Sequence, residues 1–271
     1  MEAEGSCMLD LTLVVQDFDD LVEADYYTFN AARNQALRLA LTEAVLLLDV
    51  DFILSASFLE ELRSPNAYDS LISHLHQHRL LIIPAFETNT DEEDGEMLAK
   101  SLVAEGKDAA VDAFLSNETD VFQRRWFPAG HASDKTLEWI DSSQIFSTEY
   151  TENYEPYVVI LRKDVVWYDE RFRGYGWDKI FHILSLAGTG IAFDVHPTAF
   201  AIHIPHAPST SIAATNGSSQ AQRIQSILQQ ASVEVKAGTF VPATSFPHIC
   251  GAVWREQSVG PAIDEEAWAR P

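Results

Sequence analysis

The sequence predicts an α/β fold, in which strands and helices alternate along one chain of 271 residues. Short apolar runs that are typical of buried strands recur at 44–48, 80–84 and 157–161. The segment 28–42 instead carries apolar residues at helical spacing, with Thr28 or Asn30 near its start. This alternation indicates a sheet with helices packed on its faces.

The other expected elements continue the pattern. Further strands are predicted at 9–15, 191–195 and 200–204, and further helices at 57–63, 68–78, 97–115, 179–187 and about 221–231. The segment 87–96, ETNTDEEDGE, predicts an acidic loop. The last residues, 232–271, are rich in Pro, Gly and Ala, so we expect a tail that wraps around a single domain spanning 1–271.

The charge excludes some classes of partner. The chain holds 41 acidic and 18 basic residues, a formal net charge of -23. Such a surface repels the phosphate backbone of nucleic acids and anionic membranes. A bound nucleotide remains compatible, because a cation and a local Arg or Lys can offset the field. No apolar run is long enough for a membrane helix, and the acidic start MEAEGSCMLDL lacks the pattern of a signal peptide.

Two carboxylates, Asp49 and Asp51, directly follow the apolar run 44–48. A strand buried on both faces would deliver them to its carboxyl end, the edge of an open α/β sheet where ligands bind. Carboxylate oxygens suit Mg²⁺ or Mn²⁺, and such a cation stabilises a diphosphate leaving group. The alternative is a chance pair that merely ends a strand, because short motifs have many false positives.

Two histidines, His203 and His206, end the predicted strand 200–204 in a similar way. Imidazole also binds metals of the Mn²⁺ class, so an aspartate and a distant histidine could complete one site. A core or surface histidine near a turn is the alternative for either residue.

The segment 155–179 combines carboxylates with aromatic rings. The residues of interest are Glu155, Asp169, Tyr175, Trp177 and Asp178. Aromatic faces stack on sugar rings, and carboxylates accept hydrogen bonds from hydroxyls or act as general base. A buried aromatic core with ion pairs such as Asp169–Arg171 is the alternative.

These segments together resemble a known family, glycosyltransferase family 49, which includes the LARGE xylosyl/glucuronyltransferases and the β-1,4-glucuronyltransferase that acts on α-dystroglycan glycans. The resemblance covers about residues 26–230. The matching stretches are YTFNAARN (27–34), LLLDVDFI (46–53), LIIPAFET (81–88), GHA with a following Trp139 (130–139), EPYVV (155–159), YDERFRGYGWDKI (168–180) and HIPHAPS (203–209). Single motifs are weak, but their shared order and spacing are specific.

The resemblance implies a GT-A-like fold, which is a Rossmann-related mixed β-sheet flanked by helices. It further implies Mn²⁺ (or Mg²⁺) as cofactor, a UDP-sugar donor that is commonly UDP-glucuronate, a glycan or glycoprotein acceptor, and work in the Golgi lumen. The family's metal ligands fall on Asp49, Asp51 and His203. Family members sit behind an N-terminal anchor, and this sequence shows neither an anchor nor a signal peptide.

Further roles are carried over position by position. Arg33 and Asn34 match the helix before the Asp pair, where donor contact is expected, and His131 matches a residue expected on the acceptor side. Tyr175 and Trp177 are expected to contact the acceptor.

One departure from the family concerns the catalytic base. Position 178 is Asp where relatives carry Asn, which cannot be a base. Among the candidate bases Glu155, Asp169 and Asp178, the first two therefore rank above the third.

A second departure is at the start of the chain. Family domains begin with further strand and helix ahead of the strand at 9–15, so we expect a fold that lacks those first strands. The predicted function is an inverting, metal-dependent transfer of a sugar from a UDP-sugar to a glycan hydroxyl. The alternatives are a catalytically degenerate relative that binds a sugar or nucleotide, and a metal-dependent hydrolase that uses the same ligands.

Overall fold

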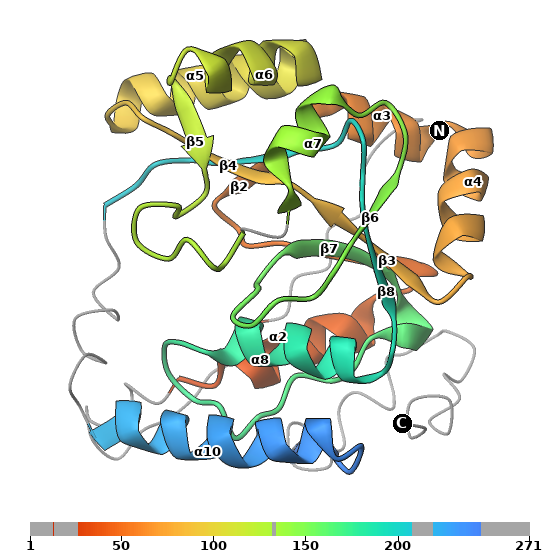
Figure 1. Ribbon diagram of the computed structural model, residues 1–271, viewed down its shortest axis with the longest axis vertical. Coiled ribbons are helices and arrows are strands. Elements are labelled where there is room, and N and C mark those ends of the chain that lie inside the picture. Colours follow the sequence, from red (N-terminus) through yellow and green to blue (C-terminus); the bar gives the residue numbers. More distant parts are fainter. Residues whose placement is uncertain (1–12, 14–26, 132–133, 208–218, 245–271) are drawn as a thin grey trace.

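The strands form two mixed sheets, with helices packed on both sides (Figure 1). The computed structural model describes residue 13 and residues 27–131, 134–207 and 219–244. The five-stranded sheet has the order β1-β7-β3-β8-β6, and the four-stranded sheet has the order β2-β9-β4-β5. This arrangement confirms the predicted α/β class and is consistent with a GT-A-like fold.

The bounds of the elements follow the chain. The strands are β1 (Ala44–Leu47), β2 (Phe52–Leu54), β3 (Arg79–Ile83), β4 (Ala85–Thr88), β5 (Thr119–Val121), β6 (Phe146–Thr148), β7 (Tyr157–Leu161), β8 (Ala192–Val195) and β9 (Ala201–His203). The α-helices are α2 (Phe29–Leu39), α3 (Ala56–Arg63), α4 (Pro65–Leu75), α5 (Glu92–Glu105), α6 (Lys107–Leu115), α7 (Thr136–Asp141), α8 (Asp178–Gly188) and α10 (Ser219–Lys236). A short 3-10 helix spans Arg162–Asp164.

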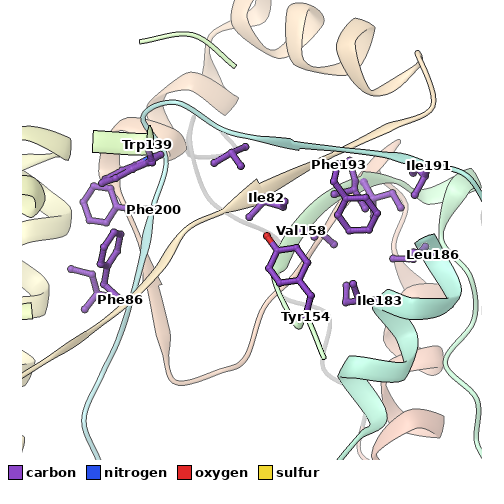
Figure 2. Packing of buried hydrophobic residues seen from close by; sticks show 14 of the residues in the cluster. Ile82, Phe86, Trp139, Tyr154, Val158, Ile183, Leu186, Ile191, Phe193 and Phe200 are labelled. Carbon is purple, nitrogen blue, oxygen red and sulfur yellow. The ribbon is translucent and has the colours of Figure 1, made fainter. Parts of the chain in front are cut away.

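The strand β7 of the large sheet is buried on both faces, because each of its residues is apolar or aromatic. In β7, Val158 and Ile160 belong to one core cluster, whereas Val159 and Leu161 belong to another. Side chains alternate between the two faces of a strand, so each face of β7 has its own core. Figure 2 shows the first core, where Ile183 of α8 lies near Val158. In Figure 1, α2, α8 and α10 lie on one side of the large sheet, and α4 lies on the other.

Several predictions about elements need correction. The expected helix 97–115 is two helices, because Gly106 has a φ of 99°, in the left-handed region that favours glycine, and separates α5 from α6. The acidic loop 87–96 instead contains the start of α5, where acidic residues complement the helix dipole. Strand β1 is half-buried rather than buried on both faces. The predicted strand 9–15 lies outside the described residues, apart from residue 13.

The two sheets meet where the site lies. Only Pro84 separates β3 from β4, so one stretch of chain passes from the large sheet to the small one. Residues 48–51 make the same passage between β1 and β2. Strand β2 pairs antiparallel with β9, with Phe52 opposite His203, and the Ile204 N–H donates to the Asp51 carbonyl over 2.8 Å. This register brings the end of β9 beside the Asp pair.

No helix within the described part of the chain is long and apolar enough to cross a membrane.

Candidate active site

Three side chains from two segments point their ligand atoms at one another. The Asp51 Oδ2 atom lies 3.4 Å from His203 Nε2 and 3.0 Å from His206 Nε2. One ligand atom from each residue lies within 4.8 Å of the other two. The pairing of β2 with β9 explains the arrangement, because it places residues 51 and 203 next to each other although they are far apart in sequence.

The surroundings of the Asp51 carboxylate suit a residue that coordinates a cation. Its Oδ1 atom is buried and has no hydrogen-bond partner among the described residues, and burying an unpartnered carboxylate oxygen is costly. Two ligands that sit about 2.1 Å from one metal at right angles are about 3 Å apart, which matches the Asp51–His206 spacing. The His203 ring is held by the rings of Phe52 and Phe122, at centroid distances of 5.3 and 5.0 Å. Among the described residues, Asp51, His203 and His206 are therefore the set that could hold a metal ion.

Asp49 faces a different partner. Its Oδ2 atom accepts hydrogen bonds from Lys179 Nζ over 2.5 Å and from the Tyr157 hydroxyl over 3.0 Å. Burial, which alone would raise the pKa of Asp49, is outweighed by Lys179 and Tyr157, so the pKa is lowered and the group stays ionised. The exposed Val50 lies between the two aspartates. Asp49 therefore meets Lys179 and Tyr157, whereas Asp51 meets the two histidines.

A cavity of about 390 Å³ opens beside β1 and reaches Asp49. Its walls come from β1, α2, the start of β7 and α8, and they include Arg33, Tyr168, Lys179 and His182. The Arg33 guanidinium pairs with the Asp178 carboxylate and covers the Tyr168 ring at 5.2 Å. Two cationic groups therefore line the cavity near the metal-ligand set.

Asn34 lies behind the cavity wall. Its side chain is buried, donates to the Tyr168 carbonyl over 2.8 Å and accepts from the Tyr168 N–H over 2.8 Å. It therefore fixes the backbone of the residue on which Arg33 packs.

Glu155 lies close enough to Asp49 and His131 to feel their charges. The Glu155 N–H donates to the Gly130 carbonyl over 2.9 Å. Burial raises the pKa of the Glu155 carboxyl, against the opposing effects of Lys179 and His131. His131 is buried, stacks on the Tyr157 ring at 5.8 Å, and lies 3.2 Å from Asp134 through its Nδ1 atom.

The remaining residues expected in the site have different surroundings. The buried Asp169 carboxylate accepts hydrogen bonds from the backbone N–H, Nε and Nη2 of Arg171, with Nη2–Oδ2 at 2.6 Å, as the ion-pair alternative anticipated. Asp178 begins α8, and its carboxylate forms an ion pair with Arg33. Tyr175 is 42% exposed. Trp177, the residue before α8, has a φ of 66°, which is uncommon for a bulky residue and turns the backbone into the helix.

The sequence interpretation did not single out Lys179 or Tyr157. Lys179 is near the start of α8, and a lysine in a helix gives no signal of a site, because lysines in proteins are mostly exposed. Tyr157 opens a strand that reads as core. Their shared role depends on the packing of α8 and β7 around Asp49.

The comparison with protein families defines the class. The profile of the family described as "Glycosyl-transferase for dystroglycan" matches residues 8–237, most of the chain. The chain belongs to this glycosyltransferase family, as its motifs predicted.

Individual relatives carry related names. The chain is 34% identical over 186 residues to the xylosyl- and glucuronyltransferase LARGE2 of Mus musculus. The matched region covers 69% of this chain and 25% of that protein. The glycosyltransferase-like protein LARGE of Caenorhabditis elegans is 31% identical over 189 residues, 69% of this chain and 28% of its own length. The glycosyltransferase-like protein gnt14 of Dictyostelium discoideum is 33% identical, over 68% and 27% respectively. The matched region spans about a quarter of each of these curated relatives.

Proposed function

We propose that this chain is the catalytic part of an inverting, cation-dependent glycosyltransferase that moves a sugar, with glucuronate as the first candidate, from a UDP-sugar to a glycan hydroxyl. One observation carries the proposal: Asp51, His203 and His206 converge, and the buried Asp51 Oδ1 atom lacks a partner among the described residues. The names of the relatives support the reaction class, because they include xylosyl- and glucuronyltransferases. Work in the secretory lumen is part of the same proposal.

The metal-ligand residues are Asp51, His203 and His206, with Asp49 beside them. When bound, Mn²⁺ or Mg²⁺ would supply positive charge against the diphosphate of the leaving group. The chain adds its own cations: Lys179 and Arg33 line the adjoining cavity, where they can contact phosphate oxygens. The cavity could then admit the nucleotide while the net charge of the protein remains strongly negative.

Glu155 is the base that the geometry favours. Its backbone is anchored to Gly130, its pKa is raised by burial, and no hydrogen bond to its carboxylate occurs among the described residues. A raised pKa suits a group that must take a proton near neutral pH. Glu155 removes the proton from the acceptor hydroxyl, the freed oxygen forms the bond to the anomeric carbon, and the nucleoside diphosphate leaves with the electron pair of the broken bond. Asp169 and Asp178 are already held by arginines.

The test combines binding with turnover. Thermal unfolding of the wild type is measured with a panel of UDP-sugars, with and without Mn²⁺, because a ligand that binds the folded state raises the unfolding midpoint. Asp51→Ala is expected to lose the Mn²⁺-dependent stabilisation and to lower transfer by more than about 100-fold, since even the outer partners of metal ligands contribute 10–100-fold. Asp69→Ala removes an exposed carboxylate on α4 and serves as the matched control.

Two outcomes would change the conclusion. Full transfer activity of Asp51→Ala would refute the cation-dependent mechanism. Tight binding of UDP-sugars by the wild type without turnover of any donor would favour the degenerate, sugar- or nucleotide-binding relative instead.

A further inference from the structure

The first turns of α5 lie against the segment that carries two of the metal-ligand residues. Helix α5 packs on β2, β4 and β9 of the small sheet (Figure 1). Its Gly95 is buried, and a Cβ on this residue would lie 2.7 Å from Pro205 Cγ and 2.5 Å from Thr88 Oγ1. Carbon atoms in van der Waals contact are about 3.5–4.0 Å apart. A larger residue at position 95 therefore does not fit unless its neighbours move.

The helix itself gives no reason for glycine at position 95. Gly95 is the fourth residue of α5, and its N–H donates to the Asp91 carbonyl over 2.8 Å, as in a regular helix. Its φ is not among the positive values found in the described part of the chain. Glycine is less favoured in helices than every other residue except proline. The close approach of the Pro205 ring therefore accounts for the absence of a side chain.

Pro205 lies between the two histidines of the metal-ligand set. His203 ends β9, and the Ile204 N–H then donates to the Asp51 carbonyl over 2.8 Å. One residue after the proline, His206 Nε2 lies 3.0 Å from Asp51 Oδ2. The proline ring includes its own backbone nitrogen and fixes φ, so a shift of the ring also shifts the backbone. The seat of Pro205 on α5 thus sets where His206 begins.

His206 depends on this seat more than His203 does. The His206 side chain is 49% exposed, and its Nδ1 atom lies 2.8 Å from the carbonyl of the adjacent Ala207. The His203 side chain is only 18% exposed and is held by the rings of Phe52 and Phe122. The more exposed of the two imidazoles therefore takes its position largely from the backbone that carries it.

Helix α5 is the rigid side of the contact. Its Ala99 and Leu102 are buried in the first core. At its start, the Asp91 side chain accepts from the Asp94 N–H. Packed cores resist displacement, so added bulk at position 95 would move the segment after β9 before it moved the helix.

We propose that Gly95 is a positioning residue of the metal site. By leaving room for the Pro205 ring on α5, it holds His206 at ligand distance from Asp51. This inference rests on the proposed function, because it concerns the same cation. Binding of the cation can nevertheless be measured without transfer of a sugar.

Mn²⁺ binding by the full chain tests this role, measured by isothermal titration calorimetry without a nucleotide sugar. Gly95→Ala is expected to raise the Kd for Mn²⁺ by about tenfold, the lower end of the effect of residues that orient metal ligands. Pro205→Ala removes the ring and adds no bulk, so it is expected to fold and to raise the Kd by a smaller factor.

A double-mutant cycle separates positioning from general damage. His206→Ala removes the ligand through which Gly95 acts, so adding Gly95→Ala to it should change the Kd by less than about twofold. Gly188→Ala is the matched control, because its Cβ would lie 2.6 Å from Val235 Cγ1 between α8 and α10. Helix α10 lies at the opposite end of the molecule from α5 (Figure 1). The control should lower the midpoint of thermal unfolding and leave the Kd for Mn²⁺ unchanged.

Each result decides the question. The proposal is overturned if Gly95→Ala binds Mn²⁺ as tightly as the wild type, if its effect persists in full beside His206→Ala, or if Gly188→Ala raises the Kd as much. Should Gly95→Ala not fold, an unchanged Kd in Pro205→Ala has the same consequence.

The outcomes also separate this inference from the proposed function. A wild type that binds no Mn²⁺ overturns both. A wild type that binds Mn²⁺ and transfers sugar, with no effect of Gly95→Ala, refutes only the positioning role. Mn²⁺ binding that depends on Gly95 and His206, in a protein that transfers no sugar, would support the positioning role and refute the transferase activity.

Discussion

The buried His182 makes the stability of this protein sensitive to acid. Its Nε2 atom donates to the Val166 carbonyl over 2.7 Å, and its ring stacks on Tyr168 at 3.8 Å, on the wall of the cavity. Burial is the main cause that lowers the pKa of His182 from 6.5 to about 4, with the Val166 carbonyl acting in the opposite direction and Arg33 reinforcing the shift. The folded protein therefore keeps the ring neutral at pH values where the unfolded chain protonates it.

The direction of the pH dependence of stability follows from the lowered pKa of His182. Because the folded state binds fewer protons, the contribution of His182 is fully present above pH 6.5 and is lost as the pH falls toward 4. The whole effect is about 3 kcal/mol, at 1.36 kcal/mol for each pKa unit. Between pH 7 and pH 5 the free energy of unfolding should fall by about 2 kcal/mol from this group, or about 4–8 °C in Tm.

The measurement is a difference between two proteins. Urea unfolding of the wild type and of His182→Gln at pH 7 and pH 5 cancels the titration of all other groups. The stability advantage of the wild type should shrink by about 2 kcal/mol at the lower pH. The exposed variant His76→Gln is the control, and its difference from the wild type should stay within about 0.5 kcal/mol. An advantage of His182 that is equal at both pH values would refute the reasoning.

Two further predictions concern the base and the packing of α10. Glu155→Gln should lower the rate of transfer by about 10²–10⁴-fold and leave UDP-sugar binding unchanged. Asp169→Asn should mainly lower the midpoint of thermal unfolding, because it breaks the buried pair with Arg171. A loss of rate in Asp169→Asn alone would make Asp169 the base instead of Glu155. Gly188→Ala would place a Cβ 2.6 Å from Val235 Cγ1 between α8 and α10, so unfolding experiments should show a loss of about 1–3 kcal/mol, and unchanged stability would mean that this contact is loose.

The sequence by itself determined the class of fold, the family and most of the elements. Apolar runs such as 80–84 and 157–161 carry enough local information to predict strands, because a strand that is buried on both faces has no polar positions. The spaced motifs identified the glycosyltransferase family, which the family comparison confirms. The sequence also singled out Asp49, Asp51 and His203 as metal ligands, with His206 beside them as a further imidazole.

Only the tertiary structure decided which of these side chains meet. The register of β2 against β9 brings His203 and His206 to Asp51. The packing of α8 places Lys179 within hydrogen-bond distance of Asp49. Long-range pairing of this kind depends on the geometry of two sheets and leaves no local signal in the sequence. The same reason separates the exposed Trp126 from the buried Trp139, because whether an aromatic residue enters the core depends on what packs around it.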